Sequence, residues 1–408
     1  MRIHPFWAIR APAHRASEVS CPPYDVVTPS EARELAEAKP NSFMRVIRAE
    51  VDLDPKQNPY TEAVYDQARK NLDRLLSSGH LVREPEPAMF VYRQSKGGRR
   101  QAGLVCCLDI DGYRTGAIRR HELTRPDKEA DRVRHIRALR AQAEAVMLAV
   151  PSVPAIEKQF ARDMNDRPLL HFAAKDGVTH TLWRANNPDA YASIFASVER
   201  VYIADGHHRS AAAEIVAGEL GATGGHGPQR LLSVVYPAEG LHILPYHRLV
   251  RLMGEESVES VMARLRELGP LAPMALADVT TTSGAGSVAI FASGSWWRFT
   301  LPTPTTGGAL EQLDVTRLGQ CVFAPVFGIS DERTDPRLSF AGGCDAAQLE
   351  ALVRAGHADL AFAMHPTSMS ELLAIADAQL IMPPKSTWFD PKIRSGIFLH
   401  EFAAASAG

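Results

Sequence analysis

The segment Tyr202-Ile-Ala-Asp-Gly-His-His-Arg-Ser-Ala-Ala-Ala213 constrains the fold of this chain more than any other. The apolar run 201–204 predicts a buried strand, and the alanine-rich stretch 207–220 predicts a helix. Gly206 lies between them and permits a sharp turn, because glycine tolerates backbone angles that other residues avoid. A strand that passes directly into a helix in this way indicates a fold that mixes α and β structure.

The same junction is the strongest candidate for chemistry. The first N–H groups of a helix have no partner within the helix and carry partial positive charge, so they can bind phosphate. Gly206 allows a ligand to approach the backbone, and His207 and His208 add donors. Arg209 can bind phosphate oxygens through two N–H groups. Asp205 could hold Mg²⁺ or accept a proton from a hydroxyl group.

The alternative for this junction is a structural turn whose histidines only pack against their neighbours. Two histidines and an arginine at one turn are costly to bury without partners, so the functional interpretation is favoured.

A second motif is His121-Glu-Leu-Thr124. It lacks the second histidine of the HExxH zinc motif, so it does not predict a zinc protease. Glu122 could act as a general base or a metal ligand, with His121 beside it. A helix cap is an equally good interpretation of these four residues.

A third motif is Pro383-Pro-Lys-Ser-Thr-Trp-Phe-Asp-Pro-Lys392. Lys385, Ser386 and Thr387 place a cation and two hydroxyl groups together, but the glycines of a phosphate-binding P-loop are missing. A rigid anion-binding loop and a structural loop therefore both remain open. Asp25 and Arg45 lie in two further polar and aromatic clusters and could face a ligand, although an ordinary turn and strand edge are favoured there.

The remaining pattern alternates helices and strands, which predicts an α+β fold with mixed sheets. A chain of 408 residues exceeds one typical domain, and we expect segments 1–115, 116–250 and 251–408. The charged stretch 127–148 is predicted to be one helix, with Arg132, Arg134, Arg137 and Arg140 on a solvated face. We expect further helices at 61–76, 258–268 and 368–378, and one that begins with Thr28 or Ser30 as its cap. The expected strands are 89–93, 104–108, 231–236, 241–250, 287–292, 296–301 and 359–363, with 241–250 beside 231–236. Residues 302–308 are expected to form a loop.

Composition excludes several classes of protein. Lys and Arg number 45 and Asp and Glu 47, and this balance provides no general attraction for nucleic acid or an anionic membrane. No apolar stretch approaches the roughly 18 residues that span a bilayer, and the start of the chain lacks the apolar core of a signal peptide. The five cysteines show no CxxC spacing, so neither a disulfide framework nor a thiolate zinc site is expected. We expect a cytoplasmic protein with no nucleic-acid or membrane partner.

Several motifs together resemble the family catalogued as domain of unknown function 1015. They occur in matching order from about residue 1 to residue 402, and this resemblance does not itself supply an activity. The motifs are Pro22-Pro-Tyr-Asp-Val-Val27, Ser42-Phe-Met-Arg45, His121-Glu-Leu-Thr124, Ile203-Ala-Asp-Gly-His-His-Arg209, Ile243-Leu-Pro-Tyr-His-Arg248 and Met382-Pro-Pro-Lys-Ser-Thr-Trp-Phe389.

The string from Asp205 to Arg209 also resembles the phosphate-binding turn of the ParB/sulfiredoxin superfamily. This resemblance implies a central ParB/sulfiredoxin-like unit that binds nucleotides, and one branch of that group comprises free-serine kinases that use ADP or ATP. It further implies that residues 206–209 hold phosphate and that Asp205 lies near the reacting hydroxyl group or the metal. Glu122 is our candidate for the catalytic glutamate expected upstream in such kinases.

Two hypotheses of different classes follow. The first is a nucleotide-dependent phosphotransferase acting on a small hydroxy compound such as serine, or the reverse or phosphatase reaction on phosphoserine. The second is a nucleotide-binding regulatory protein without phosphoryl transfer. For the enzyme, the catalytic candidates are Glu122, Asp205 and His207. The candidates for binding phosphate or nucleotide are Gly206, His207, His208, Arg209, Lys385, Ser386 and Thr387. The candidates for binding the substrate are Asp25, Arg45, His121 and Thr124. Asp205 would be the ligand of Mg²⁺.

Overall fold

The structure is a computed structural model that describes residues 1–221, 227–279, 284–304 and 307–402. The chain divides into two compact units. The first comprises Met1–Leu241 and Pro391–Gly408, and the second comprises His242–Asp390. The three predicted segments are therefore corrected to two units, because 1–115 and most of 116–250 contribute strands to one sheet.

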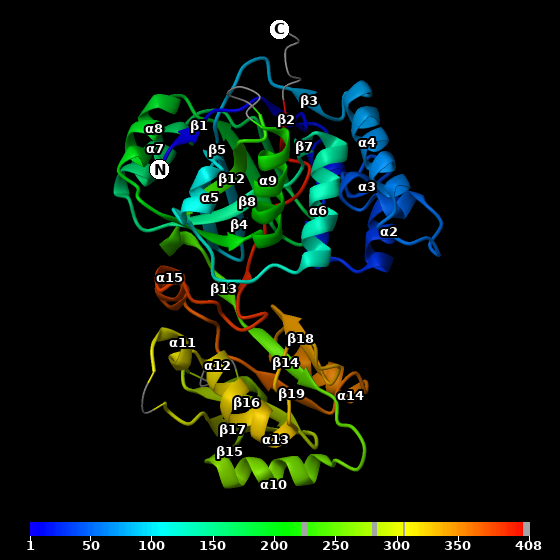
Figure 1. Cartoon of the computed structure of the whole chain (residues 1–408), viewed down its shortest axis with the longest axis vertical. Helices are drawn as coiled ribbons and strands as arrows, with labels where there is room; N and C mark the ends of the chain where they lie inside the picture. The colour runs from blue at the N-terminus through cyan, green and yellow to red at the C-terminus, as the bar shows by residue number, and fades with distance from the viewer. Residues whose placement is uncertain (222–226, 280–283, 305–306, 403–408) are drawn as a thin grey trace. The chain divides into compact units, whose positions relative to one another are not determined.

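The first unit contains a mixed sheet (Figure 1). Its strands run in the order β6-β11-β8-β12-β5-β4-β10-β9, and β1 pairs with β5. The strands are β1 (Ile3–His4), β4 (Phe90–Lys96), β5 (Arg99–Asp109), β6 (Ile118–Arg119), β8 (Val146–Val150), β9 (Leu170–Ala173), β10 (Thr179–Arg184), β11 (Val201–Asp205) and β12 (Arg230–Pro237). The strands predicted at 89–93 and 104–108 are confirmed as parts of β4 and β5, which form a hairpin paired from Phe90↔Val105 to Lys96↔Arg99.

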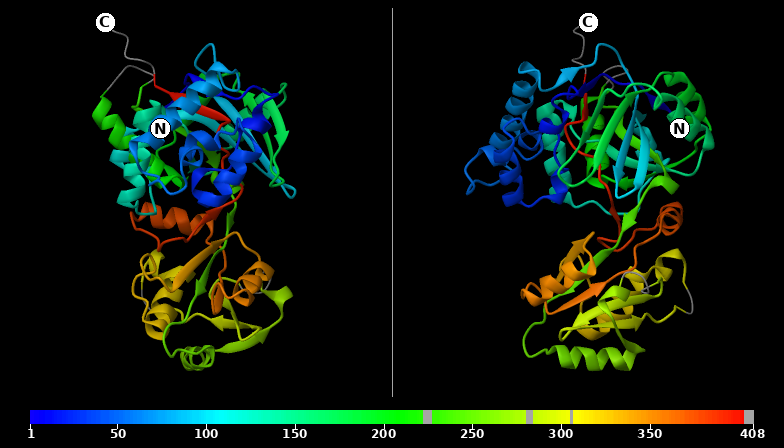
Figure 2. Two further views of the ribbon diagram at one scale, coloured as in Figure 1. Left: turned by 90° about the vertical axis from the view of Figure 1, so that its right-hand side faces the viewer. Right: turned by 180° about the vertical axis from the view of Figure 1, so that it is seen from behind.

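A smaller sheet brings distant parts of the chain together. The C-terminal strand lies between two segments from the first half of the chain, in the order β3-β2-β21-β7 (Figure 2). The strands are β2 (Ala8–Arg10), β3 (Val82–Arg83), β7 (Ala141–Gln142) and β21 (Phe398–Glu401). The end of the chain is thus part of the first unit.

Helices α2, α6, α7 and α8 of the first unit begin with a proline in the first turn, and the sequence predicts such a start for α2. The Thr28 hydroxyl accepts from the Glu31 N–H, and the Glu31 carboxylate accepts from the Thr28 N–H, so Thr28 rather than Ser30 is the cap. The helices are α1 (Ala16–Val19), α2 (Pro29–Ala38), α3 (Met44–Ile47), α4 (Glu62–Ser77), α5 (Asp111–Thr115), α6 (Pro126–Leu139), α7 (Pro154–Asp163), α8 (Pro188–Ala196) and α9 (His207–Leu220), with 3-10 turns at η1 (Tyr24–Val26), η2 (Ala49–Asp52) and η3 (Ala238–Gly240).

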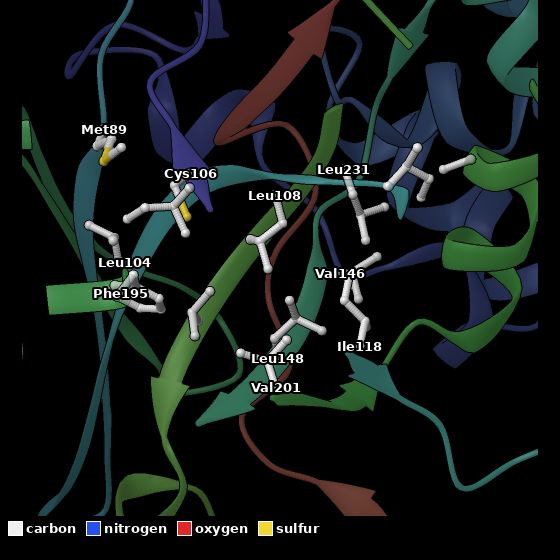
Figure 3. Packing of buried hydrophobic residues seen from close by; sticks show 14 of the residues in the cluster. Met89, Leu104, Cys106, Leu108, Ile118, Val146, Leu148, Phe195, Val201 and Leu231 are labelled. Carbon is white, nitrogen blue, oxygen red and sulfur yellow. The ribbon is translucent and has the colours of Figure 1, made fainter. Parts of the chain in front are cut away.

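The core of the first unit packs helices against one face of the large sheet. Figure 3 shows apolar side chains from β5, β6, β8, β11 and β12 that belong to one buried cluster, and Phe195 of α8 belongs to the same cluster. Ala212 and Val216 of α9 and Val133 of α6 are buried in the same cluster. The cluster holds α9 in contact with the sheet, so the start of this helix has a fixed position beside the end of β11.

The predicted helix 127–148 is wrong at its end. Helix α6 stops at Leu139, and Arg140 follows with a left-handed φ of 47°. Residues 146–150 form β8, which is buried throughout between β11 and β12. A short apolar run is compatible with either a helix or a strand from sequence alone. Here, pairing with β11 and β12 makes these residues a strand.

The second unit is built on its own sheet, in the order β15-β17-β16-β19-β14-β18. Its strands are β14 (Tyr246–Val250), β15 (Leu271–Met274), β16 (Ser287–Ala292), β17 (Ser295–Thr300), β18 (Leu338–Gly342) and β19 (Leu360–Ala363), with a separate pair of β13 (Ile243–Leu244) and β20 (Trp388–Phe389). Its helices are α10 (Val258–Leu268), α11 (Ala309–Gln312), α12 (Asp314–Leu318), α13 (Ala324–Phe327), α14 (Ala346–Arg354) and α15 (Met369–Asp377), and residues 319–323 form a π-helical turn.

Most predicted elements of the second unit are confirmed. The strands expected at 287–292 and 296–301 are β16 and β17, which pair as a hairpin. The helices expected at 258–268 and 368–378 are α10 and α15. The expectation that 241–250 pairs beside 231–236 is wrong, because β14 pairs with β18 and β19 instead. Of the expected loop 302–308, residues 305 and 306 lie outside the described residues.

Candidate active site

The candidate site begins at the junction between β11 and α9. Gly206 has a φ of 106°, in the left-handed region that favours glycine. A Cβ atom there would meet the Arg209 guanidinium at 3.0 Å. Gly206 is therefore required both by the turn and by the close approach of Arg209.

Asp205 is the centre of a buried ion cluster. One of its carboxylate oxygens accepts from Arg209 Nη2, and the other accepts from Lys392 Nζ. Burial alone would raise the pKa of Asp205, but Lys392 and Arg209 outweigh it and hold that pKa well below its usual range. Asp205 is thus an anion whose charge is compensated on both sides.

Lys392 reaches this cluster because the chain returns to the first unit at Pro391. The side-chain amides of Gln94 and Gln101, both buried between neighbouring strands, donate to the carbonyls of Lys392 at 2.8 Å and Pro391 at 3.0 Å. Burial alone would lower the pKa of Lys392, but Asp205 and Asp25 outweigh it and raise that pKa.

The His121-Glu-Leu-Thr124 motif lies against the same junction. Strand β6 runs parallel to β11, with Val201 opposite Ile118. Because parallel neighbours end at the same edge of a sheet, the chain after β6 and the chain after β11 arrive together. Glu122 Oε2 lies 3.7 Å from His207 Nδ1, and the two imidazole rings of His121 and His207 meet edge to face at 4.5 Å.

The hydrogen bonds of His207 indicate its tautomer. Its Nε2 accepts from the His121 backbone N–H at 3.4 Å, so the proton of the neutral ring is on Nδ1, which faces Glu122. Burial lowers the pKa of His207 to about 3. The Glu122 side chain is 38% exposed and His207 only 5%, so Glu122 is the member of the pair open to a substrate.

A second layer of charge lies behind the junction. Glu144 accepts from the Ser395 hydroxyl at 2.6 Å, and its Oε2 lies 3.8 Å from Arg132 Nη1. Burial raises the pKa of Glu144, although Arg209 and Arg132 oppose the shift. Arg132 also binds Asp131 at 2.7 Å and is 7% exposed, so the expectation that it lies on a solvated face is corrected.

Two residues of this cluster were missed by the sequence analysis: Lys392 and Glu144. Lys392 belongs to the third motif, where its spacing from Lys385 offered no means of choosing between the two lysines. Glu144 was hidden inside the helix that we expected to continue to 148. A charged residue beside the buried strand β8 becomes conspicuous only once that strand is known.

Two of the predicted ligand-binding arginines bind other groups of the protein. Arg209 is 9% exposed and donates to Asp205 and to the Ala145 carbonyl, so it braces the junction. Arg45 donates to Asp52 and to the Ala36 carbonyl and connects elements of the N-terminal helical region.

The other candidates in the first unit have the following positions. The His208 ring accepts from the Arg125 N–H at 3.0 Å, and the Thr124 hydroxyl donates to Glu129 at 2.8 Å at the start of α6. Asp25 is exposed in η1 and close enough to raise the pKa of Lys392. His121 is 2% exposed, and within the described residues neither of its ring nitrogens has a hydrogen-bond partner.

Lys385, Ser386 and Thr387 belong to the second unit, so their part in the site stays a prediction. Arg248, which is fully buried, donates to the carbonyls of Pro384 and Lys385 at 3.1 Å each. The Ser386 hydroxyl donates to the Pro383 carbonyl at 2.7 Å. These bonds give the loop a rigid structural role within the second unit.

A metal site made by the protein alone is not found. Among residues 1–221, 227–279, 284–304 and 307–402, no group of three or more His, Cys, Asp or Glu side chains could hold a metal ion. Nor, within those ranges, does any helix combine the length and apolar character needed to cross a membrane.

Several solved structures match a large part of the chain at low identity and with low TM-scores. A conserved hypothetical protein from Pyrococcus furiosus is 15% identical, with a TM-score of 0.37, over 72% of this chain and 94% of that one. A mutant free serine kinase in complex with ADP is 13% identical, with a TM-score of 0.36, over 70% and 87%. SbnI with a C-terminal truncation, from Staphylococcus aureus, is 14% identical, with a TM-score of 0.37, over 72% and 85%.

Comparison of the sequence with family models and curated proteins gives a clearer result than comparison with solved structures. No curated protein matches the chain. The family model described as "Protein of unknown function (DUF1015)" matches residues 3–316, which is more than half of the chain. This protein therefore belongs to the DUF1015 family.

Proposed function

We propose that this protein is a phosphotransferase that moves a phosphoryl group between an adenine nucleotide, ADP or ATP, and the hydroxyl group of a small compound. Free serine is the first substrate to test, because the sequence from Asp205 to Arg209 resembles that of free-serine kinases. The same site could run in reverse or hydrolyse phosphoserine.

The observation that carries the proposal is the meeting of Glu122 with the glycine-initiated end of α9. A half-exposed carboxylate lies 3.7 Å from a buried neutral imidazole at a helix N-terminus. A helix N-terminus favours a phosphoryl group, and a carboxylate beside it can accept the proton of an attacking hydroxyl. Neither the helix end nor the carboxylate alone would support this function.

The ion pairs of Asp205 make an anion site beside this carboxylate physically reasonable. An isolated Asp205 would repel a phosphate placed at the first turn of α9. Arg209 and Lys392 both bind Asp205, so the three groups together carry a positive charge. We infer that these two cations act behind the junction, whereas backbone N–H groups of residues 206–208 contact the phosphate.

The proposed reaction is a direct displacement. The substrate oxygen attacks the terminal phosphorus of the nucleotide, the bond from phosphorus to the bridging oxygen breaks, and the hydroxyl proton passes to Glu122. The His207 Nδ1–H faces the Glu122 carboxylate at 3.7 Å, and the two groups attract each other electrostatically.

Mg²⁺ would reach this site with the nucleotide. Both Asp205 oxygens already bind cationic side chains, so Asp205 does not fit the metal-ligand role that the sequence predicted. Mg²⁺ is commonly held by substrate phosphates together with water and few protein carboxylates, so the nucleotide phosphates would supply most of its ligands. When bound, the ion would neutralise charge on the phosphates.

The direct test is incubation of the full chain with serine or phosphoserine, ADP or ATP and Mg²⁺, followed by phosphorus NMR. New phosphorus signals that depend on both the protein and the hydroxy compound are expected. Shifts of the nucleotide signals without any new species would instead support the second hypothesis, a nucleotide-binding regulatory protein. No change in any signal would contradict both.

A further inference from the structure

The buried charges of the first unit alternate in sign from α6 to the junction. Asp131 binds Arg132 at 2.7 Å, and Arg132 lies 3.8 Å from Glu144. Burial alone would lower the pKa of Arg209, but Asp205, which it binds, and then Glu144 outweigh burial and raise that pKa. The interaction between Arg132 and Glu144 is the weakest in this series, because 3.8 Å is too long for a direct hydrogen bond.

A small cavity of about 20 Å³ lies beside Arg132 and Glu144. Its polar lining includes Arg132, Glu144, Arg209, His135 and Gln142. A cavity needs roughly 10–15 Å³ on this measure to hold a water molecule, so the space suffices for about one.

Two of the lining side chains present unsatisfied donors. Among the residues that the structure describes, Arg132 Nη1 and Arg209 Nε have no hydrogen-bond partner. Both side chains are more than nine-tenths buried. His135 and Gln142 are already engaged, since His135 Nε2 bonds to the Val46 carbonyl and the Gln142 amide bonds to main-chain groups.

We propose that this cavity is a binding site for one ordered water molecule that bridges Arg132, Arg209 and Glu144. The water accepts from Arg132 Nη1 and Arg209 Nε and donates to the Glu144 carboxylate. Three such bonds are the usual number for a buried water. The bridge completes the connection between α6 and the junction without a direct contact between the two guanidinium groups.

A small anion is the other occupant of suitable size. Charge argues against it, because Glu144 lines the cavity and Asp25, Asp131 and Asp205 lie near the same two arginines. A halide would have to approach these carboxylates, whereas water can donate to Glu144 and accept from both arginines.

Crystals of the full chain grown in sodium chloride and soaked in sodium bromide test the assignment. The expected result is a solvent peak within hydrogen-bond distance of Arg132 Nη1 and Arg209 Nε, with no anomalous signal from bromine. An anomalous peak in the cavity would make it an anion site. An empty cavity, or one closed by a direct bond from Arg132 to Glu144, would also overturn the proposal. None of these outcomes depends on whether the protein transfers phosphoryl groups.

Discussion

At the scale of single residues, burial sets the charge state of the candidate site. His207 is 5% exposed, and its neutral ring accepts a backbone N–H, so it stays uncharged in the folded protein where an exposed histidine would titrate. The Nδ1–H of this neutral ring faces the Glu122 carboxylate at 3.7 Å, which is too long for a direct hydrogen bond.

This burial predicts a pH dependence of stability. The pKa of His207 is about 3 in the folded chain and about 6.5 when unfolded, so between these values the unfolded state binds a proton that the folded state does not. The free energy of unfolding should therefore fall as the pH falls through this window, by up to about 1.4 kcal/mol per pH unit for this residue.

Urea unfolding at about pH 7, 6 and 5 measures this effect. His207→Gln should show a shallower fall than the native chain, whereas His14→Gln, at an exposed position, should keep the native slope. Identical slopes for all three proteins would mean that His207 is not held neutral by burial.

Part of the candidate site could be predicted from local patterns in the sequence. Asp205, Gly206, His207 and Glu122 were predicted in this way, and the structure places these residues at one junction. Their catalytic roles stay predictions. Lys392 could not be selected, because its contact with Asp205 spans nearly half of the chain and leaves no local signal.

At the scale of elements, the junction depends on a glycine that two constraints require. Gly206→Ala should destabilise the first unit, because φ of 106° costs a residue with a side chain about 1–2 kcal/mol and the new Cβ would press on Arg209. Gly177 has a φ of 78° and open space around it. Gly177→Ala is therefore a control: it places a side chain at a positive φ, but its Cβ atom contacts no other group.

Thermal and urea unfolding of the two variants separate these costs. We expect the Gly206 variant to lose more stability than the Gly177 variant. Equal losses would indicate that Arg209 can move away freely and does not brace the junction.

Element prediction succeeded where periodicity and caps agreed. Helices α2, α4 and α9 and the β4–β5 hairpin follow from such local signals. Predictions failed where pairing with strands distant in sequence determines the secondary structure. Residues 146–150 are an example, because they form strand β8 between β11 and β12. The ParB/sulfiredoxin-like character of the central unit stays a prediction.

At the scale of the whole molecule, the chain leaves the first unit at Leu241 and returns at Pro391. The returning segment supplies Lys392 to Asp205 and strand β21 to the smaller sheet. Contacts so distant in sequence could not be predicted from local patterns, and this explains why three segments were expected where two units exist.

The return of the chain predicts that the two lysines of the third motif differ in importance. Lys392→Met would leave Asp205 with only Arg209, and we expect a loss of about 1–3 kcal/mol in the free energy of unfolding of the first unit. Lys385 is exposed and lies 5.6 Å above the Tyr246 ring. Lys385→Met should therefore change stability by less than about 1 kcal/mol.

Urea unfolding followed by a probe confined to the first unit compares the two variants. A larger loss for Lys385→Met than for Lys392→Met would show that the ion pair with Asp205 is dispensable.

The central claim is that Glu122 accepts a proton at the end of α9, and the Glu122→Gln variant tests it most directly. Single-turnover phosphoryl transfer to serine should slow by about 10²- to 10⁴-fold, because the amide cannot accept the proton. Binding of ADP, measured by calorimetry, should stay within a few-fold of the native value, and Glu157→Gln on α7 should behave like the native chain. A Glu122→Gln protein that transfers phosphate at the native rate would contradict the account.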